Sequence, residues 1–298
     1  MRHIFIVNPN AGKILKEKLI HQIEEVFKAT DYRIILTKCE KDASAIAKRY
    51  ASLGMEIRIY ACGGDGTLNE VVNGMYEYEN AYLGIIPIGT GNDFIKSLRG
   101  YRKEDFLQID NYQNPTVKTC DVLDIDGYIC LNTTSLGFDV EVAKNVSKFK
   151  RLPLSKDIVP YYLSLGNSLL SSLNHTYNVI LDGKAIGKEN YTFVVACNGN
   201  YYGGGFCPCP DAQLDDGYID VCLIKKVSRL KIIRLANAYK KGKHVKYTDI
   251  VEMRQVKKMQ VLCDDILTMN VDGEIITKVN PSIQILPHKI KLILPNLE

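Results

Sequence analysis

Residues 56–67 read EIRIYACGGDGT, an apolar strand-like run followed by three glycines around one aspartate. A glycine-rich turn between a strand and a helix presents backbone N–H groups and the positive end of the helix dipole, which suits phosphate. Asp65 cannot bind phosphate itself, because like charges repel, but it can hold a Mg²⁺ ion that bridges phosphate oxygens, or a ribose hydroxyl. The alternative is a turn whose aspartate only caps the following helix.

Two further loops of the same kind favour the phosphate interpretation. VNPNAGK (7–13) follows the first apolar run and PIGTGNDF (87–94) follows the fourth. Loops after successive strands of an open parallel sheet converge on its carboxyl edge, where ligands bind. The sequence therefore predicts a nucleotide site built from three loops. The phosphate-binding P-loop, the dinucleotide-binding G-x-G-x-x-G pattern and the protein-kinase signatures are all absent from the sequence.

The first third of the chain alternates strand-like and helix-like periodicity. Strands are expected at 3–8, 32–37, 56–61 and 82–87, and helices at 15–29, 43–53 and 67–76. This βα repetition predicts a doubly wound, Rossmann-like α/β domain with a parallel sheet.

Beyond Thr116 strand-like runs alternate with turn dipeptides, and Asp-Gly at 126–127, 182–183 and 272–273 indicates hairpins. The fold class expected is thus an N-terminal α/β domain (1–118) and a C-terminal antiparallel β-sandwich domain (119–287) with a cleft between them. The last segment, 288–298, is expected to return to the first domain. Helices are expected at 140–150, 159–172 and 228–240.

Composition excludes several classes of protein. No apolar run approaches the roughly 20 residues that cross a bilayer, and the first residues lack a signal peptide, so a cytoplasmic protein is expected. The net charge of +4 is too small to imply nucleic acid. Nine cysteines without a paired C-x-x-C are interpreted as reduced thiols, because Cys207 and Cys209 are too closely spaced for common zinc sites.

NPNAGK, GGDGTLNEVVNG and PIGTGNDF together resemble the catalytic domain of diacylglycerol kinases, sphingosine and ceramide kinases and the soluble bacterial lipid kinases. CPDAQLDDGYIDV (209–221) and NVDGE (270–274) resemble motifs of the second domain, in the same order. GGDGT alone is weak, since NAD kinases and phosphofructokinases carry a similar loop. The resemblance covers nearly the whole chain and is closest to the soluble bacterial diacylglycerol kinases.

The resemblance implies an ATP-dependent, Mg²⁺-dependent transfer of the γ-phosphoryl group to a lipid hydroxyl, most simply from diacylglycerol to phosphatidic acid. Its ATP contacts fall on Asn8, Pro9, Asn10, Ala11, Gly12, Thr37, Cys62, Gly63, Gly64, Asp65, Gly66, Thr67, Leu68 and Thr90. The carboxylates that organise the catalytic Mg²⁺ fall on Asp65, Asp93 and Asp121, with Asp124 as a competitor for the last. Glu274 takes the place of the general base, and a structural Mg²⁺ is held by Asp216 and the carbonyls of Gln213 and Tyr218.

Three questions stay open at this stage. A kinase of soluble dinucleotides and a non-catalytic nucleotide sensor are the competing functions. The stretch 225–247, with nine Lys or Arg and no acid, is expected either to dock on an anionic membrane as a peripheral protein or to be an ordinary solvated helix. The stretch 144–156 is a second candidate for docking, and an edge strand of the β domain could pair two copies into a homodimer.

Overall fold

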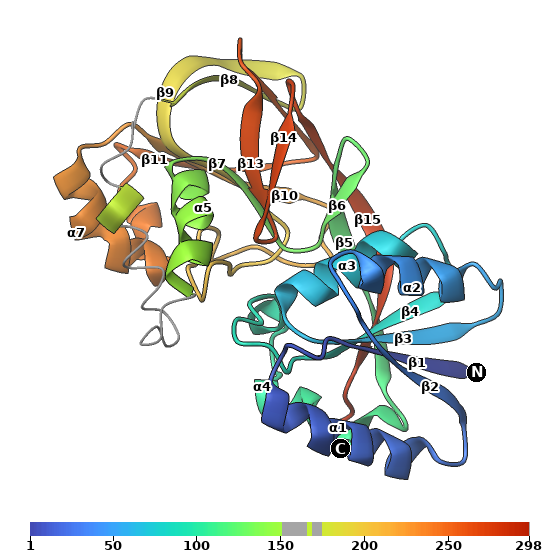
Figure 1. Ribbon diagram of the computed structural model, residues 1–298. Helices are drawn as coiled ribbons and strands as arrows, with labels where there is room; N and C mark the ends of the chain where they lie inside the picture. Colours follow the sequence, from blue (N-terminus) through green and yellow to red (C-terminus); the bar gives the residue numbers. More distant parts are fainter. Residues whose placement is uncertain (151–165, 169–174, 298) are drawn as a thin grey trace. The chain divides into compact units, whose positions relative to one another are not determined.

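The computed structural model describes residues 1–150, 166–168 and 175–297, apart from the side chains of residues 13–16 and 146–150 (Figure 1). The chain divides into two compact units. Unit 1 comprises Met1–Asp121 and His288–Glu298, and unit 2 comprises Val122–Pro287. The helix expected at 159–172 lies outside the described residues except for 166–168, which are helical.

Unit 1 is built on a parallel sheet with the strand order β15-β4-β3-β1-β2. Its strands are β1 (Arg2–Val7), β2 (Asp31–Leu36), β3 (Ile57–Cys62), β4 (Ala81–Ile86) and the last part of β15 (Ser282–Leu294). The chain runs outward from β1 to β2 and then crosses β1 to reach β3. This reversal of direction beside β1 is the point at which open α/β sheets bind ligands.

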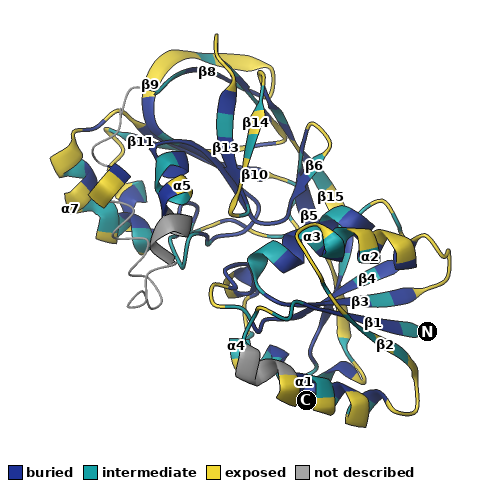
Figure 2. Ribbon diagram, in the orientation of Figure 1, coloured by how far each residue is buried: buried dark blue, intermediate teal, exposed yellow. Residues whose placement is uncertain are grey.

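Helices cover both faces of this sheet, and this confirms the doubly wound arrangement. Figure 1 shows α2 (Asp42–Ala51) and α3 (Asp65–Met75) on one face and α1 (Lys13–Phe27) on the other. Ile4 to Val7 are completely buried, as expected for a central strand covered on both faces (Figure 2). Three short helical segments complete the unit after β4: η1 (Phe94–Ser97), α4 (Lys103–Phe106) and η2 (Ile109–Tyr112).

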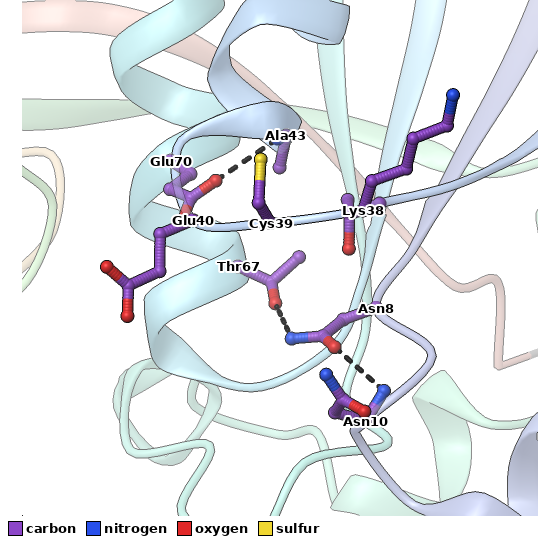
Figure 3. Close-up of a pocket in the computed structure, with 9 residues that line it drawn as sticks. Asn8, Asn10, Lys38, Cys39, Glu40, Ala43, Thr67 and Glu70 are labelled. Carbon is purple, nitrogen blue, oxygen red and sulfur yellow. Dashed lines mark hydrogen bonds between the residues drawn. The ribbon is translucent and has the colours of Figure 1, made fainter.

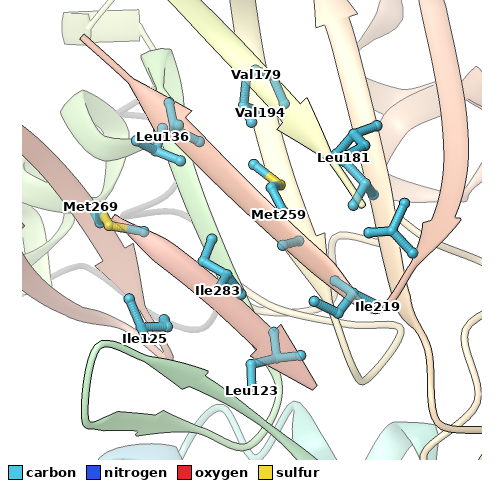
Figure 4. Packing of buried hydrophobic residues seen from close by; sticks show 14 of the residues in the cluster. Leu123, Ile125, Leu136, Val179, Leu181, Val194, Ile219, Met259, Met269 and Ile283 are labelled. Carbon is cyan, nitrogen blue, oxygen red and sulfur yellow. The ribbon is translucent and has the colours of Figure 1, made fainter. Parts of the chain in front are cut away.

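Unit 2 is an antiparallel β structure with the strand order β14-β13-β7-β9-β8-β12-β15, in which β10 pairs with β9 and β11, and β5 with β6. Its strands are β5 (Thr116–Ile125), β6 (Tyr128–Cys130), β7 (Thr133–Gly137), β8 (His175–Leu181), β9 (Lys184–Cys197), β10 (Ile219–Lys225), β11 (Val251–Val256), β12 (Lys258–Leu262), β13 (Leu267–Val271) and β14 (Glu274–Lys278). Alternate residues of these strands form one apolar core, which Figure 4 shows around Met259 and Ile283.

The three predicted Asp-Gly hairpins are confirmed. Both residues of each dipeptide, at 126–127, 182–183 and 272–273, have positive φ, as the tight two-residue hairpin turn requires. They join β5 to β6, β8 to β9 and β13 to β14. The hairpin signal therefore located these three chain reversals, although the register of β8 with β9 shifts between Asn178 and Ile180.

Two of the helices expected in the second part are also present. They are α5 (Phe138–Lys150) and α7 (Arg229–Lys240), and α7 is followed by a short turn, η3 (Lys243–Lys246). The Ser228 side chain accepts a hydrogen bond from the Lys231 backbone and caps α7. Within the described part of the chain, no helix combines the length and the hydropathy needed to cross a bilayer.

Candidate functional site

A pocket of about 290 Å³ opens in unit 1 beside the carboxyl ends of β1 and β2 (Figure 3). It is lined by residues of the loops after both strands and of the first turns of α2 and α3: Asn8, Asn10, Thr37, Lys38, Cys39, Glu40, Ala43, Thr67 and Glu70. Four of these, Asn8, Asn10, Thr37 and Thr67, are among the predicted nucleotide contacts. The structure thus brings residues far apart in the sequence to one polar cavity.

Asn8 connects the first loop to the GGDGT loop. Its backbone N–H donates to the Cys62 carbonyl at 3.0 Å, and its amide Nδ2 donates to Thr67 Oγ1 at 3.1 Å. Its Oδ1 accepts the Asn10 N–H at 2.9 Å, which closes a local turn (Figure 3). The Asn8 amide is therefore held in one orientation by the Asn10 N–H and by Thr67 Oγ1.

The opposite wall is held by hydrogen bonds from the first turn of α2. Asp42 accepts the Lys38 N–H through Oδ2 at 2.7 Å. Glu70 of α3 accepts the Ala43 N–H through Oε2 at 3.1 Å (Figure 3). Acidic side chains at a helix N-terminus satisfy its unpaired N–H groups and complement its dipole. Sequence reasoning missed Glu70, although it lies three residues after Thr67 on the same helix.

Glycines let the loops of unit 1 approach backbone to backbone. A Cβ on Gly89 would lie 2.4 Å from the Gly64 Cα, and a Cβ on Gly12 would lie 2.4 Å from the Ile88 carbonyl oxygen. The Gly89 N–H also donates to the Gly63 carbonyl at 2.9 Å. Side chains are absent here because the three predicted loops are packed against one another.

Asp65 is the first residue of α3, and its carboxylate holds the loop after β4. Oδ1 accepts the backbone N–H of Asp93 at 2.7 Å and that of Phe94 at 3.3 Å. The hypothesis that Asp65 only caps its own helix is wrong, because its carboxylate also accepts hydrogen bonds from the loop after β4. The Asp65 carboxylate is thereby held against the backbone of the loop that carries Asp93.

Two lysines that sequence reasoning missed lie beside these carboxylates. Lys96 Nζ contacts Asp93 Oδ1 at 2.5 Å, and Lys103 Nζ donates to the Gly89 carbonyl at 3.1 Å. Burial lowers the pKa of the Lys103 ammonium group, and the charge of Lys96 acts in the same direction. The i, i+3 spacing of Asp93 and Lys96 could have predicted their ion pair. No local sequence pattern predicts the contact of Lys103 with Gly89.

The third predicted carboxylate has a different environment. Asp121 is fully buried on β5, and its Oδ1 accepts the His288 N–H at 2.6 Å. Its competitor Asp124 accepts the Gly127 N–H at 2.7 Å and so belongs to the hairpin turn of β5 and β6. This contact gives Asp124 a structural role in the turn.

The remaining predicted nucleotide contacts differ in exposure. Cys62 and Leu68 are buried, and burial raises the pKa of the Cys62 thiol, so this residue acts as a small apolar group rather than a nucleophile. Thr90 is exposed at the tip of its loop. The other positions contribute backbone to the first two loops: Pro9, Ala11 and Gly66. All nine cysteines lie among the described residues, and none of them forms a disulfide there.

In unit 2, Glu274 follows the Asp272–Gly273 turn and begins β14, where it is exposed. Asp272 fixes this turn by accepting the backbone N–H groups of three consecutive residues at 2.7 to 3.0 Å, those of Leu131, Asn132 and Thr133. The Asn270 side chain accepts the Gly273 N–H at 3.1 Å. The predicted base is thus carried by an exposed strand end with an anchored turn.

The acidic loop of unit 2 brings Asp216 near Asp220. Asp216 accepts the Tyr218 N–H through Oδ1 at 3.0 Å, and Gln213 and Tyr218 are exposed. Asp220 is 6% exposed, and its Oδ2 has no hydrogen-bond partner in the part of the chain that the structure describes. Burial and the charge of Asp216 raise the pKa of Asp220 to about 6. A buried carboxylate oxygen beside a second carboxylate fits a hard cation such as Mg²⁺. Among the residues that the structure describes, no cluster of three or more His, Cys, Asp or Glu side chains has the geometry of a metal site.

Comparisons with known proteins cover both units. Residues 2–125 match the model of the diacylglycerol kinase catalytic domain, and residues 132–294 match that of the YegS C-terminal NAD kinase beta sandwich-like domain. A protein named diacylglycerol kinase from Bacillus subtilis (strain 168) is 32% identical over 274 residues, which cover 90% of this chain and 88% of the relative. A crystal structure of a diacylglycerol kinase from Bacillus anthracis str. Sterne shares the fold, with a TM-score of 0.71 at 22% identity over 98% of this chain and 96% of that one.

Proposed function

Because the chain belongs to the diacylglycerol kinase family of lipid kinases, we propose that it transfers the γ-phosphoryl group of ATP to the hydroxyl of diacylglycerol. The product would be phosphatidic acid. The observation that carries the proposal is the polar pocket of unit 1, which is lined by the loops after β1 and β2 and by α2 and α3, at the point where the strand order reverses. Kinase-family membership itself implies phosphotransfer from ATP, and the acceptor lipid is the part proposed here.

We assign the nucleotide to the pocket beside Asn8 and Thr37. Backbone N–H groups of the loops at 8–12 and 62–67 lie at strand ends or helix starts, where they suit the anionic phosphates. Thr67 and Asn8 hold each other in place through their hydrogen bond and so keep both loops in one arrangement. A pocket that is already organised loses little conformational entropy when the nucleotide binds.

Asp65, Asp93 and Asp121 are proposed to organise the catalytic Mg²⁺, which when bound neutralises charge on the phosphate oxygens. Their fit to a cation rests on donor chemistry, since all three are carboxylates in unit 1 and Asp121 is fully buried. Asp216, with main-chain carbonyls of Gln213 and Tyr218, is proposed for a structural Mg²⁺ in unit 2. Asp220, at the start of β10, is proposed as a further oxygen donor, because its buried Oδ2 has no hydrogen-bond partner among the described residues.

Glu274 is proposed as the general base that accepts the proton of the lipid hydroxyl. An exposed carboxylate is a weak base toward an alcohol, but it can accept the proton late, as the P–O bond forms. The anchored turn before it, with Asp272 bound to three N–H groups, limits the positions that Glu274 can adopt. Positional restraint of this kind is a large part of phosphoryl-transfer catalysis.

The test is a product assay with labelled ATP and Mg²⁺ on dispersed diacylglycerol, ceramide, undecaprenol and phosphatidylglycerol, and on NAD. Label in phosphatidic acid is the expected outcome. Label only in NAD would identify a soluble-dinucleotide kinase, and ATP binding without turnover on any acceptor would identify a nucleotide sensor. Either result would overturn the proposal.

Two variants test the assigned roles in the same assay. Asp65→Ala should abolish turnover, and Glu274→Gln should lower kcat by about 10²- to 10³-fold, because the amide cannot accept the proton. Glu189→Gln, an exposed glutamate on β9, is the matched control and should retain full activity. Full activity of either test variant would refute the role given to that residue.

A further inference from the structure

Helix α7 of unit 2 presents two large aliphatic side chains to solvent on one side. Leu230 is 66% exposed and Ile233 is 54% exposed, and residues three apart on a helix are neighbours. The opposite side of α7 is buried through Ile232 and Tyr239, which belong to apolar clusters of unit 2. Figure 2 shows this division of α7 into an exposed and a buried side.

The surroundings of these two side chains are strongly basic. The stretch 225–247 holds nine Lys or Arg and no Asp or Glu. Arg234 is exposed and lies one helical turn beyond Leu230 on its side of the helix. Lys241, also exposed, directly follows the last residue of α7, about three turns beyond Leu230. The acid that approaches α7, Asp249, pairs with Lys231 at 3.4 Å, and Glu252 on β11 pairs with Arg254. A positive field therefore surrounds the aliphatic pair.

We propose that α7 docks the protein on an anionic lipid bilayer, with Leu230 and Ile233 entering the interface and Arg234 and Lys241 contacting the headgroups. This arrangement is that of interfacial amphipathic helices, whose aliphatic side chains enter the headgroup boundary while Lys and Arg bind anionic lipid. Nucleic acid would use the charges but would leave two aliphatic side chains in water. The inference rests on the proposed function only in that the acceptor is a membrane lipid.

A second aliphatic pair of unit 2 provides a matched control. Ile266 and Val279 are 68% and 66% exposed and flank the open end of the β13–β14 hairpin. The charges around this pair are mixed: Asp264 pairs with Lys188 at 3.2 Å, Asp265 is acidic and Lys278 is basic. The pair therefore lacks the purely basic surroundings of Leu230 and Ile233. If exposed aliphatic area alone determined membrane binding, both pairs would contribute equally.

The experiment measures co-sedimentation of the full chain with phosphatidylglycerol–phosphatidylcholine vesicles and with pure phosphatidylcholine vesicles, over a range of salt concentrations. We expect binding only to the anionic vesicles, with a steep loss as salt rises. Leu230→Ser with Ile233→Ser should weaken binding about tenfold or more, because the anchoring apolar area is lost. Ile266→Ser with Val279→Ser should bind as the wild type does.

Charge reversal tests the electrostatic part separately. Arg234→Glu with Lys241→Glu should weaken binding by more than about tenfold and flatten its salt dependence, because four units of charge change at the surface. Lys184→Glu with Lys258→Glu, at exposed positions of other strands, is the charge-matched control and should have a much smaller effect. All variants should unfold at the wild-type temperature, since each altered side chain is exposed.

Wild-type binding by the Leu230/Ile233 double variant, or equal binding of the wild type to neutral vesicles, would overturn the docking surface. Failure of the proposed function is distinguishable from this, because turnover of a short-chain diacylglycerol in detergent micelles does not require docking. The α7 variants should keep that turnover. A wild type that binds vesicles through α7 without phosphorylating any lipid would refute the function and leave the docking surface standing.

Discussion

Glycines serve two different physical purposes in the three loops of the candidate site in unit 1 and in the Asp-Gly hairpin turns of unit 2. In unit 1 they remove side chains where backbones meet: a Cβ on Gly89 would lie 2.4 Å from the Gly64 Cα. In the hairpin turns of unit 2, a Cβ on Gly183 or Gly273 would meet nothing within 4 Å, and these glycines supply positive φ, 80° and 96°. The same residue type therefore allows close approach of backbones in the candidate-site loops and chain reversal in the hairpin turns.

The largest expected effect on stability comes from replacing a glycine that has no room for a side chain, in comparison with one that only needs a positive φ. Gly89→Ala should lower the free energy of unfolding of unit 1 by about 3 kcal/mol and abolish ATP binding, because the new methyl group collides with the Gly64 backbone. Gly183→Ala should cost about 1 kcal/mol, the cost of a left-handed conformation without any collision. Denaturant unfolding and calorimetric titration with ATP measure both.

Gly64→Ala is the control within the same contact. Its Cβ would lie 3.5 Å from the Gly89 Cα, an ordinary contact, and its φ of −103° suits any residue. We expect a stability change below about 0.5 kcal/mol. Equal destabilisation by Gly64→Ala and Gly89→Ala would contradict the steric explanation, because it would show that these loops tolerate no side chain at either position.

The aspartates of the hairpin turns give the next largest effect. Asp272→Ala should cost about 3 kcal/mol of unfolding free energy, because the N–H groups of Leu131, Asn132 and Thr133 lose their acceptor in a buried environment. Asp182→Ala should cost about 1 kcal/mol, since its partners, the N–H groups of Lys257 and Lys258, are in exposed residues that water can reach. Equal costs would show that burial of the partners does not decide the effect.

The sequence predicts those parts of the fold that a local pattern of residues encodes. The parallel strands of unit 1 were predictable because a strand covered on both faces is a short continuous apolar run, and the hairpins because Asp-Gly supplies two positive φ values. β11 and β12 (251–262) were not predicted, because charged residues interrupt their alternation and a single residue, Lys257, separates them.

The candidate site was predictable only where chemistry lies on the loops themselves. The three loops were expected to meet because parallel strands end at one edge, and Asn8 and Thr67 do form a hydrogen bond. The wall formed by Lys38, Cys39 and Glu40, and the position of Lys103 beside Gly89, depend on tertiary packing. No local pattern encodes such contacts between elements distant in the chain.

Acid should affect the two units alike, in contrast to glycine replacement. Burial lowers the pKa of His3 in unit 1 and of His244 in unit 2 from 6.5 to about 4. Between pH 6.5 and 4 the unfolded chain therefore binds more protons than the folded one, so stability is complete above pH 6.5 and is lost as pH falls toward 4. Each residue should contribute on the order of 2 kcal/mol to this loss.

The measurement is urea unfolding at a series of pH values, for the wild type and for His3→Gln and His244→Gln. Each variant should have a smaller dependence of stability on pH in this window, by up to one proton. The exposed His21 provides the control, and His21→Gln should leave the slope unchanged. A steeper slope in either buried-histidine variant would contradict the assignment.

The smallest expected effect concerns the orientation of the loop after β1 relative to the GGDGT loop. Glycine packing sets the distance between these loops, and the Asn8 side chain is expected to set their orientation. Asn8→Ala removes the hydrogen bond to Thr67 Oγ1 and the acceptor of the Asn10 N–H, so the first loop can turn relative to the GGDGT loop. We expect the Kd for ATP to rise about tenfold, equivalent to about 1.4 kcal/mol, with little change in stability. Asn80→Ala is the control, because its amide donates to the Ala51 and Met55 carbonyls, groups that do not line the pocket, and it should lower stability without changing the Kd. An unchanged Kd in Asn8→Ala would mean that the close packing of the glycines alone orients these loops, without help from the Asn8–Thr67 hydrogen bond.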